Sequence, residues 1–165
     1  MLSRAGAAGA AFAAALAAGA LGASAGEGAG LRQTSVELTF ARAINDVRVE
    51  HGLEPLAPES ALVTAAQAYS RRMLAEDRFG HAAEWWKRLE RAGASGTRLG
   101  ENLGYCAAKV CPHGSPDLLV ERWLASPAHR ANLLQPRFDH VGVGIAVGEF
   151  RGWKEVYVVT TDFDG

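Results

Sequence analysis

Apolar residues recur every three or four positions after Thr34, which is the spacing of one face of an α-helix. Thr34, followed three residues later by Glu37, forms a capping-box pattern that predicts the start of a first helix, and Gly52 predicts its end. The face that we expect to turn inward carries Leu38, Ala41, Ile44, Val47 and His51.

The helical period continues after the connector LEPLAP. Pro58 is expected near the first turn of a second helix, where the missing N–H has no helical partner. The inward face of this helix is expected to carry Leu62, Ala66, Tyr69 and Met73. After DRFGH breaks the pattern, AAEWWKRLERAG predicts a third helix with Trp86 and Leu89 inward and Gly93 at its end.

The segment SPDLLVERWLAS predicts a fourth helix. Ser115 is its expected cap, Pro116 suits its first position, and Pro127 stops or kinks it. The residues expected to face the core are Leu119, Val120, Trp123 and Leu124.

The pattern changes to strands near the C-terminal end. Residues Val141–Val147 and Glu155–Phe163 predict two antiparallel strands, with GEFRGW as the hairpin loop between them. Gly142 and Gly144 leave one face of the first strand bare, so a neighbour must approach it closely. The glycine-rich stretch ASGTRLGENLGYC is interpreted as a loop or a short extended segment. Helices followed by a hairpin indicate an α+β fold.

The first 25 residues have the composition of a secretory signal peptide. Arg4 precedes an uncharged run rich in alanine, and Ala23-Ser24-Ala25 is a small-residue cleavage site. A membrane-spanning segment is the alternative, but this run has few of the Leu, Ile, Phe and Val residues that favour insertion. We therefore expect a signal peptide over 1–25, a flexible leader over 26–33 and one domain over 34–165. The protein would be secreted or periplasmic, without a transmembrane segment after cleavage.

Charge and cysteine content narrow the function classes. The net charge of −1 becomes −2 when Arg4 is removed, which gives no basic surface for nucleic acid. Cys106 and Cys111 are the only cysteines, and in an exported protein such a pair predicts a disulfide around a small loop. A metal site at this pair would need further ligands, and only His113 is near in sequence.

Several catalytic motifs are absent from the sequence: HExxH, GxSxG, the Walker loop and the dinucleotide-binding glycine pattern. Polar residues within apolar surroundings are found instead in RFGH (His81), LGENLGY (Glu101) and SPAHRAN (Ser126 to Asn132). Two imidazoles and a carboxylate suit zinc or acid–base chemistry. The same residues also suit structural roles, with Glu101 accepting N–H groups in a turn and Ser126 capping a helix. His51, His113 and His140 are interpreted as surface or packing residues.

The segments INDVRVEHGLEPL, RFGH, GENLGY, WLASPAHRANLL and VGVGIAV follow one another in an order that resembles the CAP superfamily, whose domain is also called SCP. The similarity is to the bacterial branch and covers about Leu38 to Phe163. It implies a three-layer α-β-α sandwich around a small antiparallel sheet, with a central cleft that contains His81, Glu101 and His129. Many eukaryotic members have a second glutamate at the position of Ser126, so a mechanism with two carboxylates is in doubt.

The resemblance leaves three functions open, because a fold does not determine an activity. The first is a binding module whose cleft (His81, Glu101, Ser126, His129) holds Zn²⁺ or another divalent metal through His81 and His129. The second is a zinc-dependent hydrolase with Glu101 as general base. The third is a sterol- or lipid-binding protein. The cleft ligand would be a lipid or a peptide, and we expect a monomer.

Overall fold

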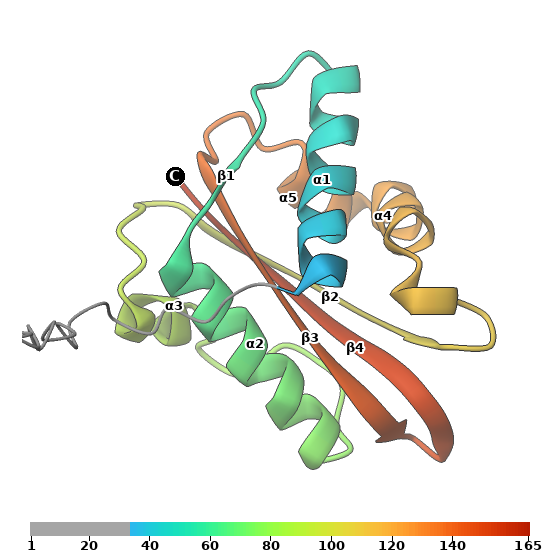
Figure 1. Ribbon diagram of the computed structural model, residues 1–165. Helices are drawn as coiled ribbons and strands as arrows, with labels where there is room; N and C mark the ends of the chain where they lie inside the picture. Colours follow the sequence, from blue (N-terminus) through green and yellow to red (C-terminus); the bar gives the residue numbers. More distant parts are fainter. Residues whose placement is uncertain (1–33) are drawn as a thin grey trace, which may run out of the picture.

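The computed structural model describes residues 34–165, apart from the side chain of His113, so the expected signal peptide and leader lie outside the described residues. Figure 1 shows the elements in chain order. They are α1 (Ser35–Glu50), β1 (Ala57–Pro58), α2 (Ser60–Ala75), α3 (Trp86–Ala92), β2 (Leu99–Ala107), a 3₁₀ turn (Pro112–Gly114), α4 (Pro116–Ala125), α5 (Pro127–Leu133), β3 (His140–Phe150) and β4 (Trp153–Asp164). Within residues 34–165, no helix combines the length and the apolar composition needed to span a bilayer.

The four strands form one sheet in the order β1-β3-β4-β2, which confirms the predicted α+β class. β3 and β4 are the expected hairpin, and they turn at Arg151 and Gly152, whose φ angles of 52° and 77° suit a two-residue turn. The glycine-rich stretch, interpreted as a loop or a short extended segment, contains the nine-residue strand β2, paired antiparallel with β4. Its glycines allow close packing, because a Cβ at Gly100 would lie 2.8 Å from the ring of Phe138.

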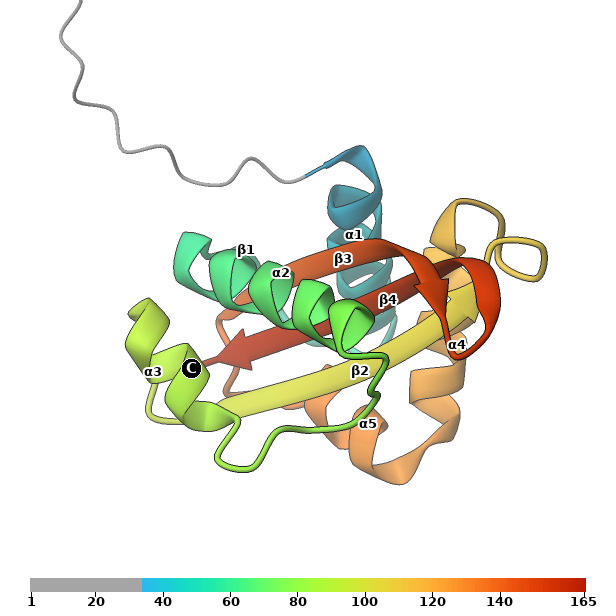
Figure 2. The same ribbon diagram turned by 90° about the horizontal axis from the view of Figure 1, so that it is seen from below.

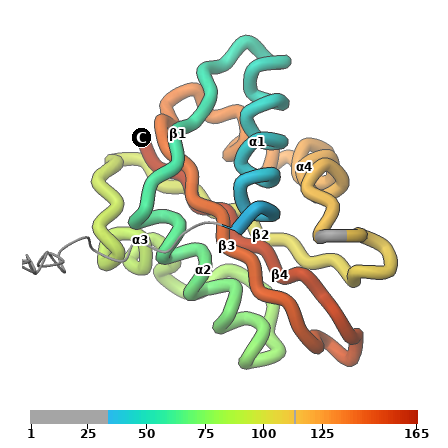
Figure 3. The backbone as a smooth tube through the Cα atoms, viewed as in Figure 1, coloured from blue at the N-terminus to red at the C-terminus, as the bar shows by residue number. Residues whose placement is uncertain are grey.

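Helices cover both faces of this sheet, as the α-β-α prediction requires. Figure 2 shows α2 and α3 on one face and α1, α4 and α5 on the other, and the tube in Figure 3 shows β3 and β4 side by side between them. The bare face of β3 lies against α2: a Cβ at Gly142 would lie 2.2 Å from the carbonyl carbon of Leu62, and one at Gly144 would lie 2.1 Å from the nitrogen of Gln67. The glycines therefore allow the helix backbone to contact the strand.

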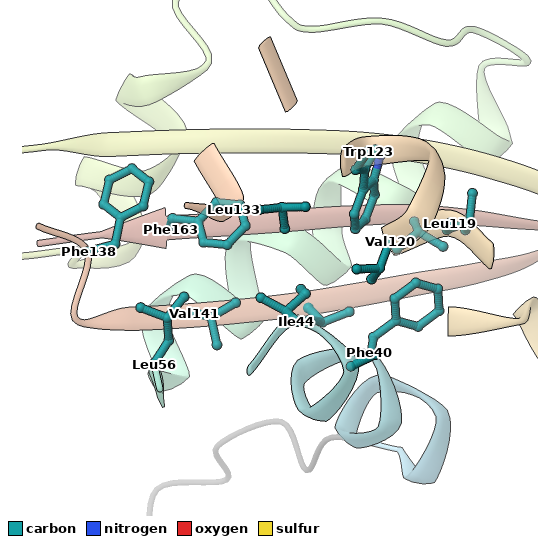
Figure 4. Packing of buried hydrophobic residues seen from close by; sticks show 13 residues of the cluster. Phe40, Ile44, Leu56, Leu119, Val120, Trp123, Leu133, Phe138, Val141 and Phe163 are labelled. Atoms are coloured by element: carbon teal, nitrogen blue, oxygen red, sulfur yellow. The ribbon is translucent and has the colours of Figure 1, made fainter. Parts of the chain in front are cut away.

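The main core lies between the sheet and α1, α4 and α5. Trp123 is 3% exposed and packs near Phe40, which confirms that it is a core residue (Figure 4). Its indole N–H donates a 2.9 Å hydrogen bond to the carbonyl of Leu103 in β2. The predicted inward face of α2 is also buried at Leu62, Ala66, Tyr69 and Met73.

Some predicted orientations are wrong. In α1, Leu38 is 50% exposed and His51 is exposed, because the buried face is centred on Phe40 and Ile44. In α3, Trp86 is 41% exposed, while Trp85 just before the helix packs against the core around Leu89. Pro58 belongs to β1 rather than to the first turn of α2, which begins at Ser60.

Two helix-end signals and the disulfide were predicted correctly. Thr34 and Glu37 form the predicted capping box. Gly93 ends α3 in the left-handed conformation, at φ 100°. Cys106 and Cys111 form the predicted disulfide, with their Cα atoms 5.8 Å apart.

Candidate functional site

Glu101 is the centre of a polar network on the side of the sheet covered by α2 and α3. It lies in β2 opposite Asp162 of β4, and its side chain is fully buried. Oε1 lies 2.6 Å from Nδ1 of His81, and Oε2 accepts a hydrogen bond from the guanidinium of Arg88. Because a carboxylate only accepts hydrogen bonds, Nδ1 of His81 carries the proton and Nε2 is its other ring nitrogen.

Arg88 joins Glu101 to a second buried carboxylate. Its Nη1 and Nη2 donate hydrogen bonds of 2.6 and 2.9 Å to the two oxygens of Asp162, and the guanidinium lies 4.7 Å from the ring centre of Tyr69. Neither Arg88 nor Asp162 was predicted from the sequence. A signal for Asp162 did exist, because it shares the inward face of β4 with Val156, Val158 and Thr160. No comparable signal marked Arg88.

His129 reaches the same region from α5, which begins at Pro127 after the chain leaves α4. Asn102 donates a hydrogen bond of 3.1 Å to the carbonyl oxygen of His129. Asn132, one turn further along α5, donates to the carbonyl oxygen of Glu101 at 3.1 Å and to Oδ1 of Asn102 at 2.9 Å. These amide bridges position α5 against β2, and thereby His129 beside Glu101.

The structure brings three of the four predicted cleft residues to one cavity. This cavity, of about 220 Å³, is lined by His81, Trp85, Leu99, Gly100, Glu101, Ala128, His129 and Asn132. Ser126 lies instead on a neighbouring groove of about 430 Å³, which shares His129 with the cavity. That groove is lined further by Phe79, Leu103, Gly104, Tyr105, Leu119, Arg122 and Trp123.

The two histidines have different electrostatic surroundings. The hydrogen bond to Glu101 raises the pKa of His81 above its ordinary value, although partial burial opposes this. Burial, and then the nearby charge of His81, lower the pKa of His129. The charged form is therefore more favoured at His81 than at His129.

The buried ion pairs also change the pKa of their members. Burial alone would lower the pKa of Arg88, but its hydrogen bonds and ion pairs with Asp162 and Glu101 raise it. Burial raises the pKa of Asp162 to about 7, although Arg88 opposes the shift. The geometry favours the ionised pair, because the bidentate contact satisfies both oxygens of Asp162.

Two sets of residues suit a metal ion. In the cavity, His81 and His129 offer two imidazoles, while Glu101 already uses one oxygen on His81 and the other on Arg88. Glu59, His140 and Asp164 form a second set, whose ligand atoms lie within 4.8 Å of one another. In the described part of the chain, this is the one group of three His, Cys, Asp or Glu residues that meets this spacing. This group was not predicted from the sequence, because His140 was interpreted as a surface or packing residue.

A family model described as the CAP, cysteine-rich secretory protein family matches residues 41–163. Two curated Bacillus subtilis proteins are similar in sequence. YkwD, named an uncharacterized protein, is 34% identical over 113 residues, which is 66% of this chain and 40% of YkwD. YlbC, named an uncharacterized membrane protein, is 30% identical over 117 residues, which is 68% of this chain and 32% of YlbC. The chain thus matches less than half the length of either relative.

Solved structures show the same fold. An extracellular protein containing an SCP domain from Bacillus anthracis has a TM-score of 0.63 at 24% identity, covering 78% of this chain and 40% of that one. An outer surface protein from Borrelia burgdorferi also has a TM-score of 0.63, at 17% identity, covering 81% of this chain and 97% of that one. At these identities the likeness concerns the fold alone.

Proposed function

The chain belongs to the cysteine-rich secretory protein (CAP) family, and we propose that it is an exported binding module. Its cleft would hold a divalent metal ion through His81 and His129, and Zn²⁺ is the ion that we expect. The observation that carries this proposal is the position of Glu101. Its carboxylate is fully buried and lies between Arg88 and His81. It therefore acts as a fixed support for His81.

This arrangement is common around metal-binding histidines, which donate one ring N–H to a carboxylate and bind the ion through the other nitrogen. Nδ1 of His81 has that partner in Glu101, and Nε2 is the nitrogen left for a ligand. Burial lowers the pKa of His129, which favours the neutral imidazole that a second ligand requires. When bound, a zinc ion would supply an electrophilic centre for a ligand with an oxygen or sulfur donor.

The same observation argues against a hydrolase that uses Glu101 as general base. A general base must reach the proton it removes, directly or through one water molecule. Both oxygens of Glu101 are paired within the protein, and its side chain is fully buried. Ser126 adds no second carboxylate, and Glu121 is exposed on α4.

One observation favours a lipid as the ligand. The groove beside His129 has a volume of about 430 Å³, and Phe79, Leu103 and Tyr105 contribute apolar surface to it. Tyr105 is 40% exposed there, with its ring 4.8 Å from that of Phe79. Binding of a fluorescent fatty acid to the wild-type protein, and its loss when Leu103 is replaced by a bulkier residue, would favour this alternative.

We place the protein outside the cytoplasm. The composition of residues 1–25 supports export, and the disulfide between Cys106 and Cys111 is the kind of bond that persists in an oxidising compartment. Intact mass spectrometry of the protein recovered from its host tests this, with a chain beginning at Gly26 as the expected result. An uncleaved chain in the cytoplasm would contradict it.

The metal is tested by calorimetric Zn²⁺ titration of the exported protein, purified without a histidine tag. His81→Ala and His129→Ala should each remove one equivalent of bound zinc. His51→Ala, which changes an exposed histidine at the end of α1, is the matched control and should leave the titration unchanged. If either cleft variant binds zinc as wild type does, with folding intact by circular dichroism, the two histidines do not share an ion.

A further inference from the structure

We propose that Glu59, His140 and Asp164 form a second divalent-cation site, separate from the cleft of His81 and His129. Glu59 is the N-cap residue of α2, His140 is the first residue of β3 and Asp164 is the last residue of β4. One ligand atom from each lies within 4.8 Å of the other two.

The register of the sheet holds these residues in place before any ion binds. His140 lies directly opposite Asp164 in the β3–β4 pair, and its partner in β1 is Ala57. The backbone N–H of Glu59 donates a 3.1 Å hydrogen bond to the carbonyl oxygen of Val141. The three positions are therefore fixed by main-chain pairing, which keeps the entropy of assembling a site low.

This site contains two carboxylates and only one side chain that can carry a positive charge, the imidazole of His140. Asp164 is fully buried, and its Oδ1 lies 2.8 Å from Nδ1 of His140, while its Oδ2 accepts the N–H of Gly96 at 3.1 Å. Oε2 of Glu59 is buried without a hydrogen-bond partner among the residues that the structure describes. A buried oxygen without a partner is costly, and an ion is one of the groups that satisfy it.

A neighbouring carboxylate on the same strand shows what this site lacks. Asp162 lies two residues before Asp164 in β4, so both side chains are on the face covered by α2 and α3. Asp162 and Glu101 share the guanidinium of Arg88. Across residues 34–165, the ion pairs of Asp164 include His140 and no lysine or arginine. A divalent cation would supply the charge that Arg88 supplies next to it.

The donor set indicates the class of cation. One imidazole and two carboxylates suit a borderline ion such as Zn²⁺, whereas Ca²⁺ takes six to eight oxygen ligands. Zinc bonds of about 2.0–2.2 Å place two ligands at most about 4.4 Å apart. The three ligand atoms lie within 4.8 Å of one another, so they need at most a small inward movement of the side chains. Zn²⁺ is the ion that we assign.

The test uses the exported double variant His81→Ala/His129→Ala, which removes the imidazoles of the cleft. A calorimetric titration with ZnCl₂ should retain one equivalent, and zinc should raise the melting temperature. Adding His140→Ala or Glu59→Gln should abolish this equivalent or weaken its affinity at least tenfold. Glu54→Gln, at an exposed position of the same connector, is the matched control for Glu59→Gln and should change neither readout. CaCl₂ should bind far more weakly than ZnCl₂.

The outcomes separate the two sites. A folded double variant that binds no zinc would overturn this second site and leave the cleft proposal standing. A double variant that binds all the zinc of wild type would leave the second site standing and remove the cleft ion. If the double variant binds zinc equally well with and without the added Glu59→Gln or His140→Ala, the carboxylates share a proton rather than an ion and the proposal is wrong. Circular dichroism confirms folding in each case, and Glu59→Gln avoids the fully buried Asp164.

Discussion

Two hydrogen bonds, 2.6 and 2.9 Å long, join the guanidinium of Arg88 in α3 to the carboxylate of Asp162 in β4. The same guanidinium also reaches Glu101 in β2. Within the described residues, Arg88 is therefore the one positive partner that the two buried carboxylates share. Glu101 alone also contacts the imidazole of His81. The position of α3 and the support of His81 both depend on it.

Replacing Arg88 by methionine should lower the free energy of unfolding at pH 7 by about 3–5 kcal/mol, because it leaves buried charges without a partner. The loss should shrink at pH 5, because burial raises the pKa of Asp162 to about 7 and protonation of its carboxylate then removes charge. Urea unfolding at both pH values measures it. Arg91→Met, at an exposed position one turn away, is the control and should change the free energy by less than about 0.5 kcal/mol. A loss below about 1 kcal/mol in Arg88→Met would contradict the structural role given to this residue.

The two cleft histidines should affect stability with opposite pH dependence. The pKa of His81 is raised in the folded state by its hydrogen bond to Glu101, so its contribution is fully present below about pH 6.5 and is lost as the pH rises through the folded-state value. The pKa of His129 is lowered by burial, so its contribution is present above about pH 6.5 and is lost as the pH falls.

Melting temperatures from pH 5 to pH 9 check this. The decrease in melting temperature caused by His81→Ala, relative to wild type, should be larger at pH 5 than at pH 9. The deficit of His129→Ala should be larger at pH 9. Equal deficits at both ends of the range, for either variant, would mean that its imidazole is not coupled to the network.

Gly144→Ala should destabilise the fold, because the added Cβ would lie 2.1 Å from the backbone nitrogen of Gln67 and 2.3 Å from the carbonyl carbon of Ala66. The backbone of α2 must move, at a cost of about 3 kcal/mol, which is typical of severe overpacking. Gly148→Ala is the matched control, since its Cβ would meet only the end of the Leu74 side chain at 3.1 Å. Urea unfolding compares the two. Similar stabilities would mean that α2 does not lie this close to β3.

Trp123 should be a stability residue and not a ligand-binding one. Trp123→Ala should lower the free energy of unfolding by about 3–5 kcal/mol, as expected for a buried aromatic residue. Trp123→Phe should lower it by about 1–3 kcal/mol, because the buried carbonyl of Leu103 loses its hydrogen bond. Thermal melting and Zn²⁺ titration should show reduced stability with unchanged zinc affinity in Trp123→Phe. Unchanged melting together with lost zinc binding would reverse the assignment.

Features set by neighbours in the chain were predictable. The capping box at Thr34, the end of α3 at Gly93 and the disulfide of Cys106 depend on residues within a few positions of one another. The bare face of β3 also implied a close neighbour, because glycine in a strand removes side-chain packing. The sequence did not identify that neighbour, which is α2.

The sequence by itself determined the helices α1 to α4, the β3–β4 hairpin and, through an ordered set of motifs, the family and the candidate residues His81, Glu101 and His129. Only the tertiary structure decided what these residues contact. Arg88 and Asp162 are separated by 74 positions and Glu59 and Asp164 belong to different elements, so their meeting depends on sheet register and helix packing. The faces of α1 and α3 were misjudged for the same reason: a helical period shows that one face is buried, but the neighbouring elements decide which face it is.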